Sequence, residues 1–260
     1  MRIWAIANQK GGVGKTTTSL AIAAELATRG SRVLLINLDP HASLTCAFGV
    51  PADPQPRGVL DLFDEDRPPL ATLVRASEIH NLSYLPAQTG LAMLERRSAS
   101  QPGLGLALSA ALTREAGDYD YVLLDCPPTL GLLMVNALAA ADHLIIPTQT
   151  EPLALHGLNG MCRTAQMIER SRRRPLLVSI LPTLFDRRTR VGSETLAQMQ
   201  ASHGARVWGE AIPNDTRMCS IDELTRPMNA RLRSGRALSA YRDALDWILD
   251  TEQLAQVQAA

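Results

Sequence analysis

The chain has 260 residues, of which 46% are hydrophobic and 20% charged, and its 26 basic residues balance its 26 acidic residues. This composition excludes a disordered protein, and a formal net charge of zero argues against nucleic-acid or membrane binding through the summed charge of the whole surface. The length favours one domain over residues 1–260, in which we find no internal repeat and no linker.

Short apolar runs alternate with helical patterns from one end of the chain to the other. The patterns predict strands at 2–8, 32–39, 81–87, 119–128, 143–149, 176–186 and 206–213, and helices at 16–30, 103–116, 132–140, 155–171, 190–202 and 235–249, with a surface segment at 51–69. Such alternation is typical of a parallel sheet covered on both faces. We therefore predict an α/β fold with a doubly wound, mostly parallel sheet of seven or eight strands.

Targeting and metal-binding signals are missing from the sequence. The first residues enter a predicted strand without a charged leader, and no segment offers about 18 uninterrupted apolar residues. The four cysteines form no CxxC pair and have no histidines at zinc-ligand spacing. We expect a cytoplasmic protein with free thiols.

The clearest motif is QKGGVGKTTT at residues 9–18, between the first predicted strand and the first predicted helix. It is a variant of the phosphate-binding pattern GxxxxGK[ST], with Gln9 in place of the first glycine. Glycines let successive backbone N–H groups converge on phosphate oxygens at the helix N-terminus. Lys15 is expected to reach the β and γ phosphates, and Thr16 to bind Mg²⁺. The predicted nucleotide contacts are Gly11, Gly12, Val13, Gly14, Lys15, Thr16 and Thr17.

Lys10 and Lys15 are the only lysines among the 26 basic residues, and an ordinary loop of this type does not need Lys10. The run KGGVGKTT resembles the ParA/MinD family of deviant Walker A P-loop ATPases, and the resemblance extends over nearly the whole chain. It implies ATP and Mg²⁺ as cofactors and a homodimer in the ATP-bound state. It also implies that Lys15 binds ATP within its own subunit, whereas Lys10 reaches the nucleotide of the other subunit.

Three further segments match the family pattern. VLLINLDPHAS at 33–43 resembles the segment whose second acid orients the attacking water, which is Asp39 here, although Asp39 before Pro40 also has the pattern of a helix N-cap. The family usually has an acid where this chain has Asn37, so we expect no metal role there. YVLLDCPPTLG at 121–131 implies that Asp125 holds a water on Mg²⁺. IPND at 212–215 resembles the adenine-binding loop and implies contacts from Pro213 and Asp215.

Features outside these motifs separate members of the family. After Arg242 the chain carries four acids and no cation, so we expect no membrane binding. The remaining type is the short ParA-like ATPase, which uses the nucleoid as a track. Non-specific DNA binding would then use arginines, for which the candidates are Arg187, Arg188, Arg190, Arg217, Arg231, Arg233 and Arg236.

The resemblance thus implies a dimerising switch that hydrolyses ATP slowly until an unidentified partner or cargo adaptor stimulates it. The segments at 1–19, 134–151 and 181–189 look most like ParA-like proteins of the ParC type, which place chemotaxis arrays at bacterial poles. A chromosome or plasmid partition ATPase is the alternative, and a metabolic ATP-dependent ligase or synthetase on the same scaffold is an alternative of another class. The switch would be cytoplasmic, nucleoid-associated or polar.

Overall fold

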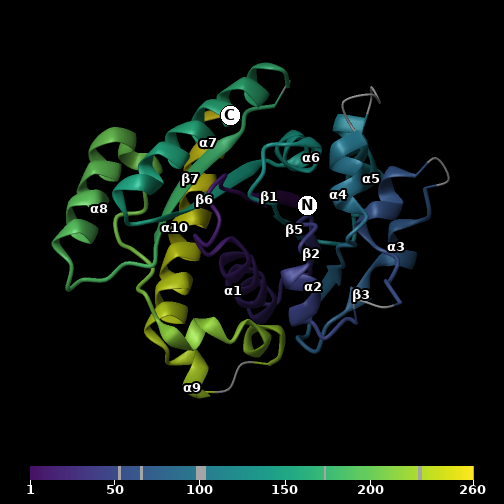
Figure 1. The fold of residues 1–260 in the computed structure, drawn as a ribbon, viewed down its shortest axis with the longest axis horizontal. Helices are drawn as coiled ribbons and strands as arrows, with labels where there is room; N and C mark the ends of the chain where they lie inside the picture. Colours follow the sequence, from purple (N-terminus) through teal and green to yellow (C-terminus); the bar gives the residue numbers. More distant parts are fainter. Residues whose placement is uncertain (52–53, 65–66, 98–103, 173, 228–229, 260) are drawn as a thin grey trace.

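The computed structural model describes residues 1–51, 54–64, 67–97, 104–172, 174–227 and 230–259 (Figure 1). Its centre is one seven-stranded sheet in the order β3-β4-β2-β5-β1-β6-β7, in which all neighbours are parallel except β3 and β4. The strands are β1 (Arg2–Ile6), β2 (Val33–Asn37), β3 (Arg75–Ala76), β4 (Leu82–Leu85), β5 (Tyr121–Asp125), β6 (His143–Gln149) and β7 (Leu177–Thr183). The predicted doubly wound, mostly parallel sheet is confirmed.

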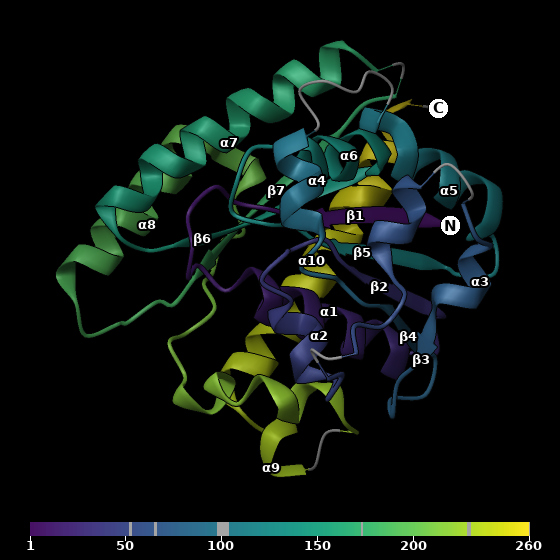
Figure 2. The ribbon, with the colours of Figure 1, turned by 45° about the vertical axis from the view of Figure 1, so that its right-hand side comes forward.

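Helices cover both faces of the sheet (Figures 1 and 2). They are α1 (Lys15–Thr28), α2 (Ser43–Ala47), α3 (Leu70–Leu73), α4 (Leu91–Arg97), α5 (Ala107–Glu115), α6 (Leu132–Ala140), α7 (Pro152–Arg170), α8 (Arg190–His203), α9 (Ala230–Arg233) and α10 (Arg236–Ala259). No helix among the described residues is long and apolar enough to cross a lipid bilayer.

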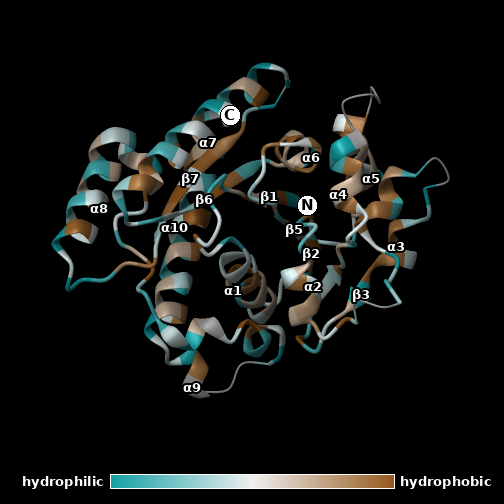
Figure 3. Cartoon of the chain, in the orientation of Figure 1, coloured by the Kyte–Doolittle hydropathy of each residue, from teal (hydrophilic) through white to brown (hydrophobic). Residues whose placement is uncertain are grey.

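Alternate residues of each central strand face the two helical layers. In β1, Ile3 and Ala5 pack into the cluster with α5, α6 and α7, whereas Trp4 and Ile6 pack into the cluster with α1 and α10. Successive side chains of a strand point to opposite faces, so a strand buried on both faces is a continuous apolar run. The central strand β2, with the sequence VLLIN, is such a run, whereas the edge strand β7 in Figure 3 combines hydrophobic residues with Ser179 and Thr183.

The structure differs from the predicted elements at residues 206–213, at β3 and at the last helix, among other places. The segment 206–213 is not a strand, because it meets β7 and the loop after it only at separate points: the isolated bridges from Ile180 to Val207 and from Phe185 to Pro213, and a hydrogen bond from the Ile212 N–H to the Pro182 carbonyl (2.9 Å). Gly209 and Pro213 interrupt the segment, and proline has no N–H to donate to a ladder. The short edge strand β3 was not predicted, since two exposed residues carry no pattern. The last helix runs well past the predicted end at 249.

A buried polar network fixes α10 to the sheet at the amino ends of the strands. Glu252 of α10 is 6% exposed, and its carboxylate accepts hydrogen bonds from Trp4 Nε1 (2.6 Å) and, through the ring Nδ1 atom, from His143 (3.1 Å). Arg2 forms an ion pair with the same carboxylate, and His143 Nε2 lies 2.8 Å from Ser179 Oγ. The network therefore joins β1, β6 and β7 to the last helix.

Replacing Glu252 with alanine should lower the free energy of unfolding by about 2–4 kcal/mol, because the buried donors of Trp4 and His143 and the charge of Arg2 lose their acceptor. Urea unfolding followed by circular dichroism measures this loss. Asp250→Ala, which removes an exposed acid from the same helix, is the matched control and should change stability by less than about 0.5 kcal/mol. Equal effects of both substitutions would contradict the assignment.

Candidate functional site

The glycine-rich loop lies between β1 and α1, as the motif requires. Gly12 and Gly14 have φ values of 74° and 87°, a backbone region that favours glycine. Gly14 is the N-cap of α1 and supplies no side chain, so the first N–H groups of the helix face the loop without a capping side chain. Thr183, at the end of β7, donates a hydrogen bond from Oγ1 to the carbonyl of buried Val13 (2.8 Å) and holds the loop against the sheet. The geometry is that of an anion-binding loop.

The two lysines of the loop have different surroundings. Lys15 is 8% exposed, and its Nζ donates to the carbonyl of Lys10 (3.1 Å). Burial lowers the pKa of Lys15, and this effect is opposed by the charges of Asp125 and Asp39. The side chain of Lys10 is 29% exposed and lies beside α7, where Nζ donates to Gln149 Oε1 (3.1 Å) and pairs with Glu151 (3.2 Å).

Asp125 ends β5 directly beside the loop, where the sheet register pairs it with Ile6 of β1 and Asn37 of β2. Its Oδ1 accepts a hydrogen bond from Ser19 (3.0 Å), whereas its buried Oδ2 has no partner among the described residues. Burial raises the pKa of Asp125 to about 7, and the Ser19 and Thr16 hydroxyls oppose that rise. A buried carboxylate oxygen without a donor suits a metal-bound water.

The segment after β2 holds Asp39 at the edge of the site. Asp39 Oδ1 accepts from the backbone N–H of His41 (3.0 Å) and lies 2.8 Å from His41 Nδ1. The predicted N-cap role is wrong, because α2 begins at Ser43 after Ala42 in the left-handed region. Asp39 therefore forms a turn with His41 and keeps Oδ2 without a hydrogen bond from the described residues.

Asn37, the last residue of β2, holds this segment through two side-chain hydrogen bonds. It is fully buried, its Oδ1 accepts from the backbone N–H of Asp39 (3.0 Å), and its Nδ2 donates to Thr45 Oγ1 (2.9 Å). The amide thus satisfies both neighbours without placing a second negative charge next to Asp125.

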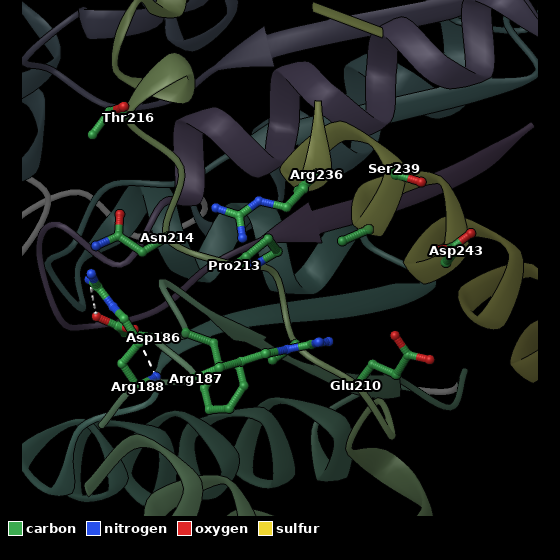
Figure 4. A pocket seen from close by; sticks show the side chains of 13 residues that line it. Asp186, Arg187, Arg188, Glu210, Pro213, Asn214, Thr216, Arg236, Ser239 and Asp243 are labelled. Atoms are coloured by element: carbon green, nitrogen blue, oxygen red, sulfur yellow. Dashed lines mark hydrogen bonds and ion pairs between the residues drawn. The ribbon is translucent and has the colours of Figure 1, made fainter. Parts of the chain in front are cut away.

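The two residues predicted to contact adenine, Pro213 and Asp215, have different surroundings in the structure. Pro213 lines a cavity of about 610 Å³ between the β7–α8 loop and α10 (Figure 4). Asp215 does not line it, because its side chain is 7% exposed and is bound to Arg217. Thr17 lies half-buried in the first turn of α1, next to Thr16.

Sequence analysis missed the residues that hold the predicted ones in place. Ser19 binds Asp125, Thr183 binds the loop, Thr45 binds Asn37, and Gln149 and Glu151 bind Lys10. Only Ser19 carried a signal, because it lies four residues after Lys15 and so on the same face of α1. Thr183, Gln149 and Glu151 come from distant segments, and Thr45 comes from the helix that follows Asn37. Among the described residues, no group of three or more His, Cys, Asp and Glu side chains could hold a metal ion.

Comparison with known proteins agrees with this geometry. Residues 1–178 match the family model described as "AAA domain". The sporulation initiation inhibitor protein Soj of Bacillus subtilis is 33% identical over 93% of this chain and 96% of its own length. The chromosome-partitioning ATPase Soj of Thermus thermophilus is 38% identical over 98% and 96%, and the chromosome partitioning protein ParA of Caulobacter vibrioides is 32% identical over 100% and 98%.

Solved structures resemble the whole chain. A protein from Mycobacterium smegmatis described as a cobyrinic acid a,c-diamide synthase, with bound ADP and magnesium, has a TM-score of 0.82 and 35% identity over 97% of this chain and 96% of that chain. A variant of McdA from Cyanothece in complex with ATP has a TM-score of 0.83 over 95% and 96%, and its 22% identity shows the fold alone.

The geometry of the loop predicts how its glycines tolerate a side chain. A Cβ added at Gly11 meets nothing within 4 Å and Gly11 is exposed, so Gly11→Val should fold with stability within about 0.5 kcal/mol of the natural chain. Gly12→Val and Gly14→Val place a β-branched residue at positive φ and should each cost about 1–2 kcal/mol. Thermal unfolding without nucleotide compares the three variants, and equal losses in all three would contradict this account.

Proposed function

Since the chain belongs to the ParA/MinD family of P-loop ATPases, we propose that it is a partition-type ATPase that binds ATP with Mg²⁺, dimerises around the nucleotide and hydrolyses it slowly. The observation that carries the proposal is the difference in surroundings between the only two lysines of the sequence. Lys15 is buried beside Asp125, whereas Lys10 extends from the same loop to an exposed pair with Glu151.

ATP would be held mainly by the backbone of residues 11–16 and by Lys15, whose buried ammonium group has no carboxylate within ion-pair distance among the described residues. A polyphosphate supplies the missing negative charge. The residues suited to Mg²⁺ are the Thr16 hydroxyl and, through water, the unpartnered Oδ2 of Asp125. When bound, Mg²⁺ neutralises charge on the phosphate oxygens.

Hydrolysis would depend on Asp39. Its side chain is 15% exposed, its Oδ1 is held by His41, and Oδ2 remains available to a water at the mouth of the site. An oriented carboxylate that accepts a hydrogen bond from the attacking water is the role that a water-positioning residue needs. The intramolecular contacts of Asp39 keep that carboxylate at the entrance and do not bury it.

Dimerisation would use Lys10. In the single chain the Nζ group of Lys10 is held by Gln149 and Glu151, so it must leave these partners to reach a nucleotide in another subunit. The pair is cheap to open, because the side chain of Glu151 is 51% exposed and exposed ion pairs contribute about 0–1 kcal/mol. ATP bound in both subunits would then stabilise the dimer through contacts that the monomer lacks.

Relatives named for chromosome partition favour a DNA-related cargo over the chemotaxis array that the sequence segments suggested. A polar array stays a narrower hypothesis about the cargo. The M. smegmatis structure described as a synthase favours a second candidate, a metabolic ATP-dependent synthetase. Light scattering and DNA retention with ATP, with ADP and without nucleotide test the switch, because a synthetase would turn over a small substrate and show no ATP-dependent change in either readout.

Lys15→Ala should abolish ATP binding, because the loop loses the only lysine that is buried among the phosphate-binding residues. Titration with a fluorescent ATP analogue should show a loss of at least about 100-fold in affinity, equivalent to about 2.7 kcal/mol. Arg29→Ala, at the far end of α1, is the control and should bind normally. Retained micromolar affinity in Lys15→Ala would show that Lys15 is not a phosphate ligand.

Lys10→Ala and Asp39→Ala should both stop hydrolysis but leave opposite assembly states. Lys10→Ala removes the charge that reaches the partner nucleotide, so it should bind ATP as a monomer. Asp39→Ala removes only the group that orients water, so it should accumulate as an ATP-bound dimer. Light scattering with ATP and Mg²⁺ measures the mass of each variant. If both variants remain monomers, Asp39 acts as a dimer contact. If both variants form dimers, Lys10 is only a surface charge.

A further inference from the structure

Two copies of one side-chain arrangement lie on neighbouring segments, the β7–α8 loop and the segment before α10. In the β7–α8 loop, Asp186 accepts hydrogen bonds from the backbone N–H of Arg188 (3.0 Å), from Arg188 Nε (2.9 Å) and from Arg188 Nη2 (2.8 Å). Asp215 accepts the same three bonds from Arg217, at 3.2, 3.0 and 2.7 Å. We call each arrangement an Asp-x-Arg fork.

The segments that come just before the two forks are hydrogen-bonded to each other. The N–H of Phe185 donates to the carbonyl of Ile212 (3.0 Å), and the N–H of Asn214 donates to the carbonyl of Phe185 (2.9 Å). The two segments are therefore neighbours, and Asp186, Arg188 and Thr216 from them line the cavity in Figure 4. Arg187 and Arg236 also line that cavity, and neither forms an ion pair with a described residue.

The forks differ in how firmly they are built into the fold. The Asp215 side chain is only 7% exposed, and the Arg217 side chain is 39% exposed. The Asp186 side chain is 29% exposed and that of Arg188 is 89% exposed. An exposed ion pair contributes about 0–1 kcal/mol, so the Asp186–Arg188 fork can open without disturbing packing.

The loop that carries Asp186 does not depend on the fork for its shape. The carbonyl of Asp186 accepts from the backbone N–H (3.1 Å) and the hydroxyl (2.9 Å) of Thr189, which caps α8. These bonds use backbone atoms of residue 186, so they survive a change of its side chain. The carboxylate is thus an addition to a loop that is already fixed, and it is bound to the largely exposed Arg188.

From these contacts we propose that Asp186 is an intramolecular competitor for Arg188, which a nucleic-acid phosphate must displace before Arg188 can bind it. The proposal rests on the DNA binding suggested for the candidate arginines. A phosphate and a carboxylate bind the same edge of a guanidinium group, and the negative charge of Asp186 repels the phosphate as well. Asp186 therefore weakens DNA binding and makes the natural surface release DNA at lower salt.

The ion pairs of the candidate arginines would make DNA binding depend on dimerisation. With Arg188, Arg190 and Arg217 paired to Asp186, Glu194 and Asp215, three of the candidate arginines contribute little net charge in a single chain. The side chain of Arg231 lies outside the described part, and Arg233 forms no ion pair with described residues. Weak binding by one chain means that retention on DNA requires two chains together, which only the nucleotide-bound dimer provides.

Asp186→Asn is the direct test, because the amide oxygen can still accept from the Arg188 backbone while the negative charge is lost. With ATP and Mg²⁺, binding to a fluorescent DNA duplex at about 0.1 M salt should tighten by about three- to tenfold, and the slope of log affinity against log salt should steepen by up to about 1 per chain. Arg188→Ala should weaken binding. The double variant should behave like Arg188→Ala, because the gain depends on Arg188.

Asp120→Asn is the matched control, since it removes an exposed aspartate that is paired with Arg32 at the opposite end of the strands. It should bind DNA as the natural chain does. An equal gain in Asp120→Asn, or a gain that survives in the double variant, would reduce the effect to overall charge. Weaker binding by Asp186→Asn would make Asp186 a residue that positions Arg188. If none of the proteins binds DNA, the DNA-binding proposal itself fails, and this inference fails with it.

Discussion

The parallel pairing of β5 with both β1 and β2 is the constraint on which the site depends. This register places Asp125 beside Ile6, the last residue of β1, and beside Asn37, the last residue of β2. The glycine-rich loop starts from one of these strand ends and the Asp39 segment from another. Because parallel strands end at the same edge of the sheet, three segments far apart in the sequence meet there. A register shift of one residue would turn Asp125 to the other face.

The fold keeps uncompensated charge at that edge. Lys15 and Asp125 are both buried without an ion-pair partner among the described residues. Burial lowers the pKa of Lys15 and raises the pKa of Asp125, so it favours the neutral form of each side chain. Such groups cost stability in the free chain unless a ligand satisfies them. A polyphosphate and a divalent cation carry the two charges that are missing, so the ligand would complete the electrostatics of the core. The remainder of the molecule, including the Glu252 network, supplies the rigidity that holds the strands in register.

On the surface, in contrast to the buried site, many charged side chains form local ion pairs. A formal net charge of zero arises here from local pairs, of which the two Asp-x-Arg forks and the Lys10–Glu151 pair are examples. Exposed pairs of this kind add little stability, so they can exchange partners at small cost. Residues proposed to act on a second subunit or on nucleic acid are held by such pairs in the single chain. The buried Lys15 and Asp125 would be compensated by a small ligand, whereas exposed residues such as Lys10 and Arg188 can change partners when the chain assembles.

The sequence by itself determined the fold class, the phosphate-binding loop and the family, because the glycine-rich motif with Lys15 and the apolar runs followed by Asp39 and Asp125 are local patterns. It could not determine which distant groups satisfy those residues. Thr183 against Val13 and Glu151 against Lys10 follow from the strand order, whereas Thr45 against Asn37 follows from the turn that joins β2 to α2. It also misjudged residues 206–213 and the role of Asp39 as a cap, since a β-prone segment and an Asp-Pro pair have more than one local solution. Tertiary structure chose between these solutions, because the neighbours that decide burial and hydrogen bonding come from elsewhere in the chain.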